Sequence, residues 1–261
     1  MRDRHDLVID TARAMAFLSR LPVPDRFFEG HDGNLSKTVA VFPLAGLLIA
    51  LPSAALLGLL VVIGAPPMIA ALTALALQIL LTGALHEDGL SDTADGLGGG
   101  RDRERALAIM KDSRIGTYGA LALILSVGLR VSCVAALATV ISPLAIALIW
   151  LAAAAFSRAA MVWHWSALPP AKADGVAAAA GLPDPGAARR AVAAGIAVPA
   201  LLAFFVLPLW STGLALVASC LLTAGFTRFV RSKISGHTGD TIGASQQIAE
   251  IGFLLSLAIL L

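Results

Sequence analysis

Long apolar stretches alternate with short polar segments along this chain. Several of the apolar runs approach or exceed the roughly 20 residues that an α-helix needs to cross a bilayer. The pattern predicts an all-α, polytopic integral membrane protein with six or seven transmembrane helices in a single domain, with the lipid bilayer as its first partner. The expected spans cover about residues 39–63, 68–85, 118–140, 144–163, 191–207, 209–227 and 248–261. The last stretch is short for a crossing, which is why the count is six or seven.

The N-terminal segment, residues 1–37, has a different pattern. Arg13 and Arg20 bracket a short amphipathic stretch, which predicts an interfacial helix lying along the membrane surface. Pro22 and Pro24 are expected to end this helix, because proline cannot continue the backbone hydrogen bonding. The segment lacks an uninterrupted apolar run, so we expect no cleavable signal peptide.

Composition supports the membrane assignment and argues against two other classes. Hydrophobic residues make up 58% of the 261 residues, and the mean hydropathy is +0.84. A soluble domain of this size could not bury so much apolar surface. The formal net charge of +2 is too small to indicate a nucleic-acid partner, so we expect none.

The placement of charge predicts the topology. Apart from Arg130 and Arg158, every Lys and Arg lies in the N-terminal segment or in one of three polar connections, residues 86–116, 164–190 and 228–250. The three intervening hairpins carry no charge of either sign. All the polar segments would therefore emerge on one side, which the positive-inside rule makes cytoplasmic. We expect a multi-pass protein of the cell inner membrane whose active site lies on the cytoplasmic face.

The connection 86–116 begins with an acidic run. Four carboxylates fall within residues 87–95, in a chain where only 14% of residues are charged. Asp88, Asp92 and Asp95 are spaced four and then three residues apart, so a helix would place them on one face. Like charges so close repel one another unless a cation lies between them, and Mg²⁺ prefers carboxylate oxygen. The run therefore predicts a Mg²⁺ site.

Basic and glycine-rich residues follow this acidic run in the same connection. Arg and Lys bind phosphate oxygens, and glycine lets a backbone approach a ligand closely. Carboxylates, metal and cations together are what phosphoryl transfer requires, since its catalysis is mostly positioning and charge neutralisation. On these grounds alone, a solvated loop that caps a membrane helix and the acidic motif of an intramembrane prenyltransferase stay open as alternatives.

Two polar residues stand inside predicted spans, and one lies at a span end. Arg130 is near the middle of the third span, where an unpaired charge is costly, so a paired or functional role is expected. Arg158 lies nearer the cytoplasmic end and is expected to extend its charge to the surface. His164, between Trp163 and Trp165, is typical of an interfacial aromatic belt.

Four stretches of the sequence together resemble one known family. The longest covers residues 86–119 and contains DGLSDTADGLGG at 88–99; the others are GHTGDTIGA at 236–244, FLSRLPVP at 17–24 and FPLAG at 42–46. These motifs resemble the cobalamin synthase family, the adenosylcobinamide-GDP ribazoletransferases, over essentially the whole chain. Position 87 departs from the family pattern, because it is Glu where members often carry a hydrophobic residue.

The resemblance implies a concrete reaction. The donor would be adenosylcobinamide-GDP, and the acceptor α-ribazole or α-ribazole 5′-phosphate. A ribose hydroxyl of the acceptor would attack the cobinamide-side phosphorus, GMP would leave, and adenosylcobalamin or its 5′-phosphate would form. Mg²⁺ would be the cofactor. Which acceptor is native, how many metal ions bind and whether the protein forms oligomers stay open at this point.

The resemblance also implies roles for particular residues. The implied metal ligands are Asp88, Asp92 and Asp95, with Glu87 as a further candidate. One of the three Asp, or Asp240, would accept the proton of the attacking hydroxyl, which makes these four the catalytic candidates. The implied substrate-binding residues are Gly98, Gly99, Arg101, Lys111, Arg114, Arg130 and His237.

Three alternative functions can be weighed against the residues. The CDP-alcohol phosphotransferases use similar chemistry, but their DGxxAR and GxxxDxxxD arrangement is absent. A prenyltransferase would normally show a second Asp-rich motif, where this chain offers only Asp240. A cation-coupled transporter would place its site near the bilayer midplane between repeats, and no repeat is evident here.

Overall fold

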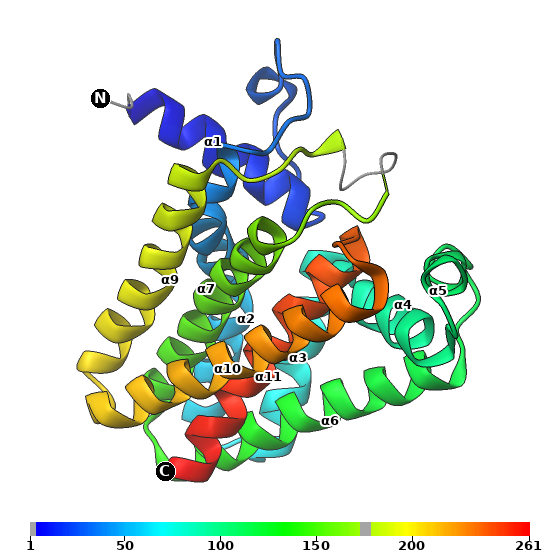
Figure 1. The fold of residues 1–261 in the computed structure, drawn as a ribbon. Coiled ribbons are helices and arrows are strands. Elements are labelled where there is room, and N and C mark those ends of the chain that lie inside the picture. The colour runs from blue at the N-terminus through cyan, green and yellow to red at the C-terminus, as the bar shows by residue number, and fades with distance from the viewer. Residues whose placement is uncertain (1–3, 173–178) are drawn as a thin grey trace.

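A computed structural model describes residues 4–172 and 179–261, and within them the regular elements are helices (Figure 1). The helices are α1 (Arg4–Leu18), α2 (Phe42–Val62), α3 (Pro67–Thr82), α4 (Leu85–Gly99), α5 (Arg103–Ile109), α6 (Thr117–Val140), α7 (Pro143–Ala167), α9 (Pro185–Phe204), α10 (Leu209–Ile234) and α11 (Gly239–Leu260), with two 3-10 turns, η1 (Asp25–Phe27) and η2 (Thr38–Val41). Residues 173–178 of the predicted polar connection 164–190 lie outside the described residues.

Six helices in the described part of the chain are long and apolar enough to cross a membrane, which confirms the predicted fold class. A seventh crossing requires α3 and α4 together, and these two are bent by 88° relative to each other. The predicted second span, residues 68–85, therefore ends early. α3 stops at Thr82, and the next two residues, Gly83 and Ala84, have φ of 63° and 58°. Such left-handed φ values end a helix, and glycine adopts them without strain.

Helix α7 is the central element of the bundle. It packs against α2, α9 and α11, and 83% of its apolar window is buried, against 28% for α10. The small residues of the run Ala152–Ala155 let neighbouring backbones approach α7 closely. Such close packing matters in lipid, because the hydrophobic effect does not drive helices together there.

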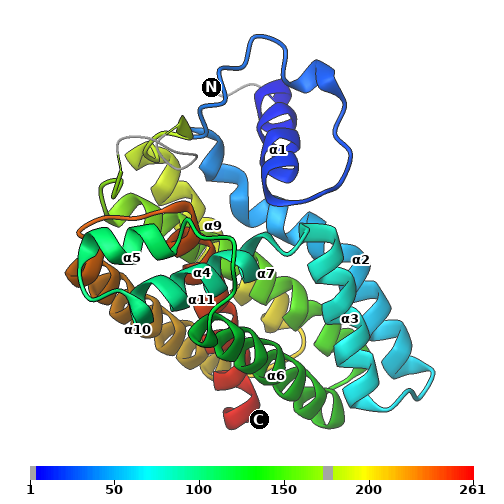
Figure 2. The same ribbon diagram turned by 90° about the vertical axis from the view of Figure 1, so that its right-hand side faces the viewer.

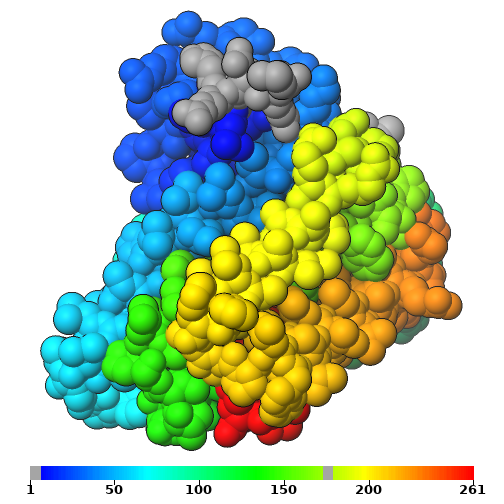
Figure 3. All heavy atoms as spheres, turned by 90° about the vertical axis from the view of Figure 1, so that its left-hand side faces the viewer, coloured from blue at the N-terminus to red at the C-terminus, as the bar shows by residue number. Residues whose placement is uncertain are grey.

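Helices α9 and α10 form much of one outer face (Figure 3). Large apolar side chains are exposed along both, among them Phe204, Phe205, Leu209 and Trp210 around the connection between them. Such a surface suits a hydrocarbon environment. At one end of the bundle stands α1, while the C-terminus lies at the other end (Figures 1 and 2). This placement agrees with an odd number of crossings.

Helix α11 corrects the expected organisation of the last polar segment. Residues 228–250 were predicted as a connection followed by a short helix, but α10 continues to Ile234 and α11 starts at Gly239. Thr238 caps α11 through a reciprocal pair of hydrogen bonds with Thr241. The last helix therefore has 22 residues, long enough to cross a bilayer.

The polar connection 86–116 is also mostly helical. Helix α4 contains the whole acidic run, and the short helix α5 follows it. Asp102 caps α5 by accepting a hydrogen bond from the Arg105 backbone N–H at 2.7 Å. The N-terminal helix is confirmed as well, although it starts at Arg4 and buries Ala14 and Leu18 against α2; its place on the membrane surface stays a prediction.

Candidate active site

Helices α4 and α11 cross in backbone contact at two glycines. A Cβ atom added at Gly89 would lie 2.8 Å from the Asp240 carbonyl oxygen and 3.3 Å from the Cα of Gly243. Only glycine allows this approach. The crossing brings Asp88 and Asp92 of α4 next to Asp240 of α11, although the two helices are far apart in the sequence.

The resulting group, Asp88, Asp92, Asp95 and Asp240, is called the carboxylate cluster below. Asp92 lies near enough to the other three to be repelled by each of them. Within the described residues, neither Asp88 nor Asp92 accepts a hydrogen bond, while Thr238 Oγ1 donates to Asp240 Oδ2 at 3.2 Å. Asp88 is exposed, and Asp92 and Asp240 are half-buried. The cluster therefore concentrates negative charge at the helix crossing, and Lys172 lies near enough to Asp240 to offset part of it.

Asp95 has a different environment from Asp88 and Asp92. Its Oδ2 accepts a hydrogen bond from the Gly116 backbone N–H at 2.7 Å, and its Oδ1 accepts one from Gly119 at 2.9 Å. These donors belong to the first turn of α6, whose positive end favours a carboxylate. These two hydrogen bonds connect Asp95 of α4 to the start of α6. Among the described residues, no three His, Cys, Asp or Glu side chains are grouped closely enough to hold a metal ion together.

Glu87 points away from the carboxylate cluster into the protein interior. Its Oε1 is 3.0 Å from Arg130 Nη2 and accepts a hydrogen bond from Gln247 Nε2 at 3.1 Å. Because successive residues of a helix are about 100° apart, Glu87 and Asp88 face different surroundings. The structure gives this metal-ligand candidate protein partners instead.

Arg130 belongs to an interior ion network made of Glu87, Arg130, Arg158 and Glu250. Arg130 Nη1 is 3.5 Å from Glu250 Oε1, and Arg158 Nη1 is 3.2 Å from Glu250 Oε2. Both arginines are only 2% exposed. The paired role expected for Arg130 is confirmed. The surface position expected for Arg158 is wrong, because its guanidinium has a buried partner on α11.

Sequence reasoning missed the α11 half of this network. Glu250 also accepts a hydrogen bond from Gln246 Nε2 at 2.6 Å, and Gln247 joins Glu87 to the helix. Ser157 Oγ donates to Glu250 Oε2 at 3.4 Å. The available signal was the spacing of Glu250, which lies four residues after Gln246 and three after Gln247 and so shares a helix face with both.

The basic candidates lie on the surface of the connection after α4. Arg114 is 86% exposed on its side chain and forms an ion pair with Asp112 at 2.5 Å, which lowers the pKa of Asp112 to about 2. Lys111 and Arg101 are exposed. Gly98 and Gly99 belong to the last turn of α4, where the Tyr118 ring packs on Gly98.

His237 lies in the connection between α10 and α11, joined to the end of α7. Its backbone N–H donates to the Pro169 carbonyl, and its carbonyl accepts from the Ala171 N–H, both at 2.8 Å. The imidazole is 1% exposed, its edge meets Trp165, and neither ring nitrogen has a partner within the described residues. Burial lowers the pKa of His237 to about 4. The imidazole is therefore neutral at pH 7, and it packs against the ring of Trp165.

His164 and Trp165 are not part of an interfacial belt. His164 is fully buried, with ring nitrogens 2.8 Å from Thr227 Oγ1 and 3.3 Å from Thr241 Oγ1, and Trp165 is 1% exposed. Only Trp163 of the three residues is exposed. The predicted belt is wrong because the end of α7 is enclosed by α10 and α11.

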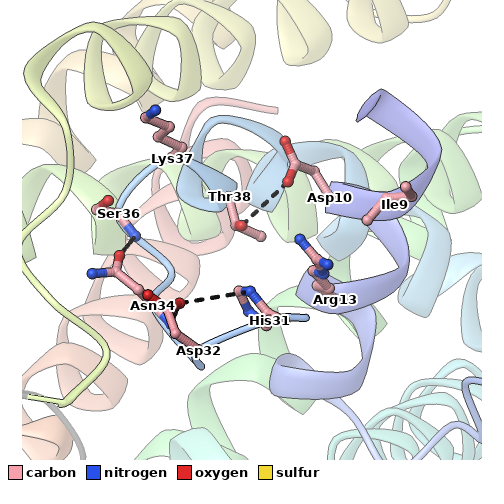
Figure 4. A pocket seen from close by; sticks show the side chains of 9 residues that line it. All are labelled: Ile9, Asp10, Arg13, His31, Asp32, Asn34, Ser36, Lys37 and Thr38. Atoms are coloured by element: carbon pink, nitrogen blue, oxygen red, sulfur yellow. Dashed lines mark hydrogen bonds and ion pairs between the residues drawn. The ribbon is translucent and has the colours of Figure 1, made fainter. Parts of the chain in front are cut away.

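A polar cavity of about 680 Å³ lies beside α1, away from the predicted site residues (Figure 4). Its lining includes Arg13, His31 and Lys37 together with Asp10 and Asp32. Arg13 Nε donates to the Phe27 carbonyl at 2.7 Å, which fixes the loop before η2. Sequence reasoning missed this cavity, because its charges are scattered along the N-terminal segment.

Comparison with known proteins matches the chain over nearly its full length. The family model described as cobalamin-5-phosphate synthase matches residues 10–258. A Rhizobium meliloti (strain 1021) protein named adenosylcobinamide-GDP ribazoletransferase is 55% identical, covering 99% of each chain. Relatives of the same name from Sinorhizobium sp and Azorhizobium caulinodans are 57% and 44% identical, covering 97% and 98% of each chain. No solved structure matches. The chain belongs to the cobalamin-5-phosphate synthase family.

Proposed function

We propose that this protein is an adenosylcobinamide-GDP ribazoletransferase, which joins the cobinamide phosphate of its donor to α-ribazole or α-ribazole 5′-phosphate. The observation that carries the proposal is the meeting of Asp88, Asp92 and Asp240 at one helix crossing, in a chain whose named relatives align from end to end. A prenyltransferase or a cation-coupled transporter is not favoured, because neither accounts for that full-length similarity.

The chemistry of the cluster fits Mg²⁺. Asp88, Asp92 and Asp240 supply oxygen donors that repel one another, and Mg²⁺ is normally held by one or two carboxylates together with substrate phosphates. A preformed cage of three side chains is therefore not required. When bound, the ion neutralises charge on the diphosphate. Asp95 would orient the helix that carries the ligands, since both its oxygens accept bonds from α6.

The protein's own groups would then hold the acceptor and move its proton. A ribose hydroxyl oxygen of the acceptor forms a bond to the cobinamide-side phosphorus, and the bond from that phosphorus to the oxygen of GMP breaks. The hydroxyl proton passes to Asp92 or Asp240, which lie together at the crossing. Lys111 and Arg101 are exposed and could approach the departing GMP phosphate, and Arg114 could do so by leaving its surface ion pair with Asp112.

We place this site on the cytoplasmic face of the cell inner membrane. Apart from Arg130 and Arg158, Lys and Arg gather in the N-terminal segment, around α5, after α7, near the start of α9 and in the last turns of α10. The positive-inside rule puts such segments in the cytoplasm. Nucleotide-linked substrates are also cytoplasmic, so the cluster would face the compartment that supplies them.

The decisive experiment uses purified protein in detergent with both substrates. GMP release should require the donor, the acceptor and Mg²⁺, and omission of any one should abolish it. Comparing kcat/KM for α-ribazole and its 5′-phosphate identifies the native acceptor. Absence of GMP release with a folded protein would overturn the proposal, and release without an acceptor would indicate a hydrolase.

A further inference from the structure

A second, smaller cavity adjoins the carboxylate cluster. Its volume is about 220 Å³, and it lies where the end of α1, the start of α4, the end of α7 and the start of α11 meet. Asp88 and Asp240 are among its lining residues, so it opens directly on the proposed reaction centre. Most of the other lining side chains are apolar: Phe17, Leu18, Leu85, Met161, Trp165 and Ile242.

The walls of this cavity are suited to a flat, apolar ring. Phe17 and Trp165 provide aromatic surface, and Met161 provides a flexible, polarisable side chain that adapts to a ligand. Trp165, Met161 and Leu18 are buried, so the walls are supported by packing rather than free to move. Two nitrogen atoms of the lining, Trp165 Nε1 and His86 Nε2, have no hydrogen-bond partner within the described residues. Buried polar atoms of this kind normally have one.

The size of the cavity limits what can enter it. Pockets for drug-sized ligands span roughly 300–1,000 Å³, so a cavity of about 220 Å³ suits one bicyclic ring and excludes a corrin macrocycle. Guanine is a poor occupant, because its edge carries several donors and acceptors that apolar walls would leave unsatisfied. The base of α-ribazole is a benzimidazole joined to ribose through one of its two nitrogens. Its other ring nitrogen can accept one hydrogen bond, and the unpaired Trp165 Nε1–H can donate it.

We propose that this cavity binds the dimethylbenzimidazole base of the acceptor and thereby determines which base the enzyme uses. The inference rests on the proposed function. The base lies between Phe17 and Trp165, and the Trp165 N–H donates to its free ring nitrogen. The attached ribose then reaches Asp88 and Asp240, where its hydroxyl loses a proton. Trp165 is a specificity-determining residue in this arrangement, held in place by His237 at its edge.

A filled cavity should change the preference of the enzyme among acceptor bases. Ala180 lines the cavity, is 5% exposed and lies outside the helices, so Ala180→Leu adds volume without disturbing a helix. We expect it to raise the KM for the acceptor at least about tenfold and to leave the KM for the donor unchanged. A tenfold change is the lower limit usually seen when one methylene group does not fit an apolar pocket. The kcat/KM ratio should shift by a similar factor toward a benzimidazole riboside that lacks the two methyl groups.

The matched control is Ala171→Leu. Ala171 is also 5% exposed and outside the helices, but it packs with Leu107 and Val230 and does not line the cavity. This variant should keep the wild-type base preference. Phe17→Ala provides the opposite change: it enlarges the cavity and should favour a bulkier tricyclic base, which keeps the test valid if Ala180→Leu does not fold.

The outcomes separate the two proposals. Wild-type protein that releases no GMP overturns the proposed function, and equilibrium binding of α-ribazole to wild type, Ala180→Leu and Ala171→Leu then tests the cavity alone. Active wild-type protein whose base preference is the same in Ala180→Leu and Phe17→Ala overturns the base pocket. A tenfold loss of α-ribazole affinity in Ala180→Leu but not in Ala171→Leu supports it.

Discussion

The carboxylate cluster and the interior ion network share two helices, but their charges are arranged in opposite ways. Asp88, Asp92 and Asp240 repel one another, and Lys172 near Asp240 offsets only part of their charge. Glu87 and Glu250, on the same two helices, are matched by Arg130 and Arg158. The charge of the first group is available to bind a ligand. The ion pairs of the second group connect α4 and α11 through Arg130 and Arg158.

The difference shows how one helix serves two environments. Glu87 and Asp88 are adjacent, yet one faces the apolar interior and the other faces the open end of the bundle. An interior carboxylate must be paired because desolvation is costly, whereas an exposed one is tolerated by water and cations. A carboxylate is therefore a better candidate for ligand binding when its side chain is not held in a buried ion pair.

The largest expected effect comes from breaking the interior network. Glu250→Gln should lower the free energy of unfolding by about 3–5 kcal/mol, because it leaves a buried guanidinium uncompensated. The double variant Glu250→Gln with Arg158→Met should recover part of this loss, since both charges are then absent. Thermal unfolding in detergent measures both. A double variant less stable than the single one would contradict the pairing.

Breaking the carboxylate cluster should affect activity and spare stability. Asp92→Asn is expected to lower kcat by roughly 10²–10³-fold or more, as for loss of a charge-stabilising group in a transition state. The unfolding temperature should stay constant or rise, because a repelling charge is removed. The control is Asp112→Asn, whose carboxylate is bonded to Arg114. Wild-type turnover in Asp92→Asn would refute the metal assignment.

Metal addition should distinguish the two groups of charges directly. Mg²⁺ at 100 times its Kd should stabilise the wild-type protein by about 2.7 kcal/mol, through mass action on the folded state. The stabilisation should vanish in Asp92→Asn and persist in Glu250→Gln, whose altered residue lies in the interior. Thermal unfolding with Mg²⁺ and with EDTA provides the measurement. Equal stabilisation of both variants would place the ion elsewhere.

The smallest effect expected is at the helix crossing itself. Gly89→Ala forces a Cβ to within 2.8 Å of the Asp240 carbonyl, so α4 and α11 must separate, at a cost of about 1–3 kcal/mol. Activity should fall as well, since Asp88 and Asp92 move away from Asp240. Gly243→Ala is the matched control, because its Cβ would make ordinary contacts at 3.5 Å. Equal losses in both variants would mean that close approach is not what the crossing requires.

Local patterns predicted most of the fold. The apolar runs predicted the positions of most of the long helices that could cross a membrane. Helix α11 was misjudged, because Gln246, Gln247 and Glu250 lower the local hydropathy although their side chains are buried. Hydropathy describes side chains singly, whereas burial depends on the partners they find.

The site was predictable only in part for the same reason. The Asp spacing on α4 predicted three carboxylates on one helix face, but the bonds of Asp95 to α6 and the approach of Asp240 depend on contacts between distant segments. The cavity beside the cluster combines Phe17, Trp165 and Ile242 from three different helices. No local pattern links these residues.

The interior ion network also constrains the order in which the protein is assembled during synthesis. Arg130 can pair with Glu87 as soon as α6 meets α4, but Arg158 precedes its partner Glu250 by 92 residues. An unpaired arginine inside a bilayer is costly, so we expect α7 to reach its final packing only after α11 has been made. The same helix delivers Asp240 to the carboxylate cluster. A chain that has not finished inserting therefore also lacks a complete reaction centre.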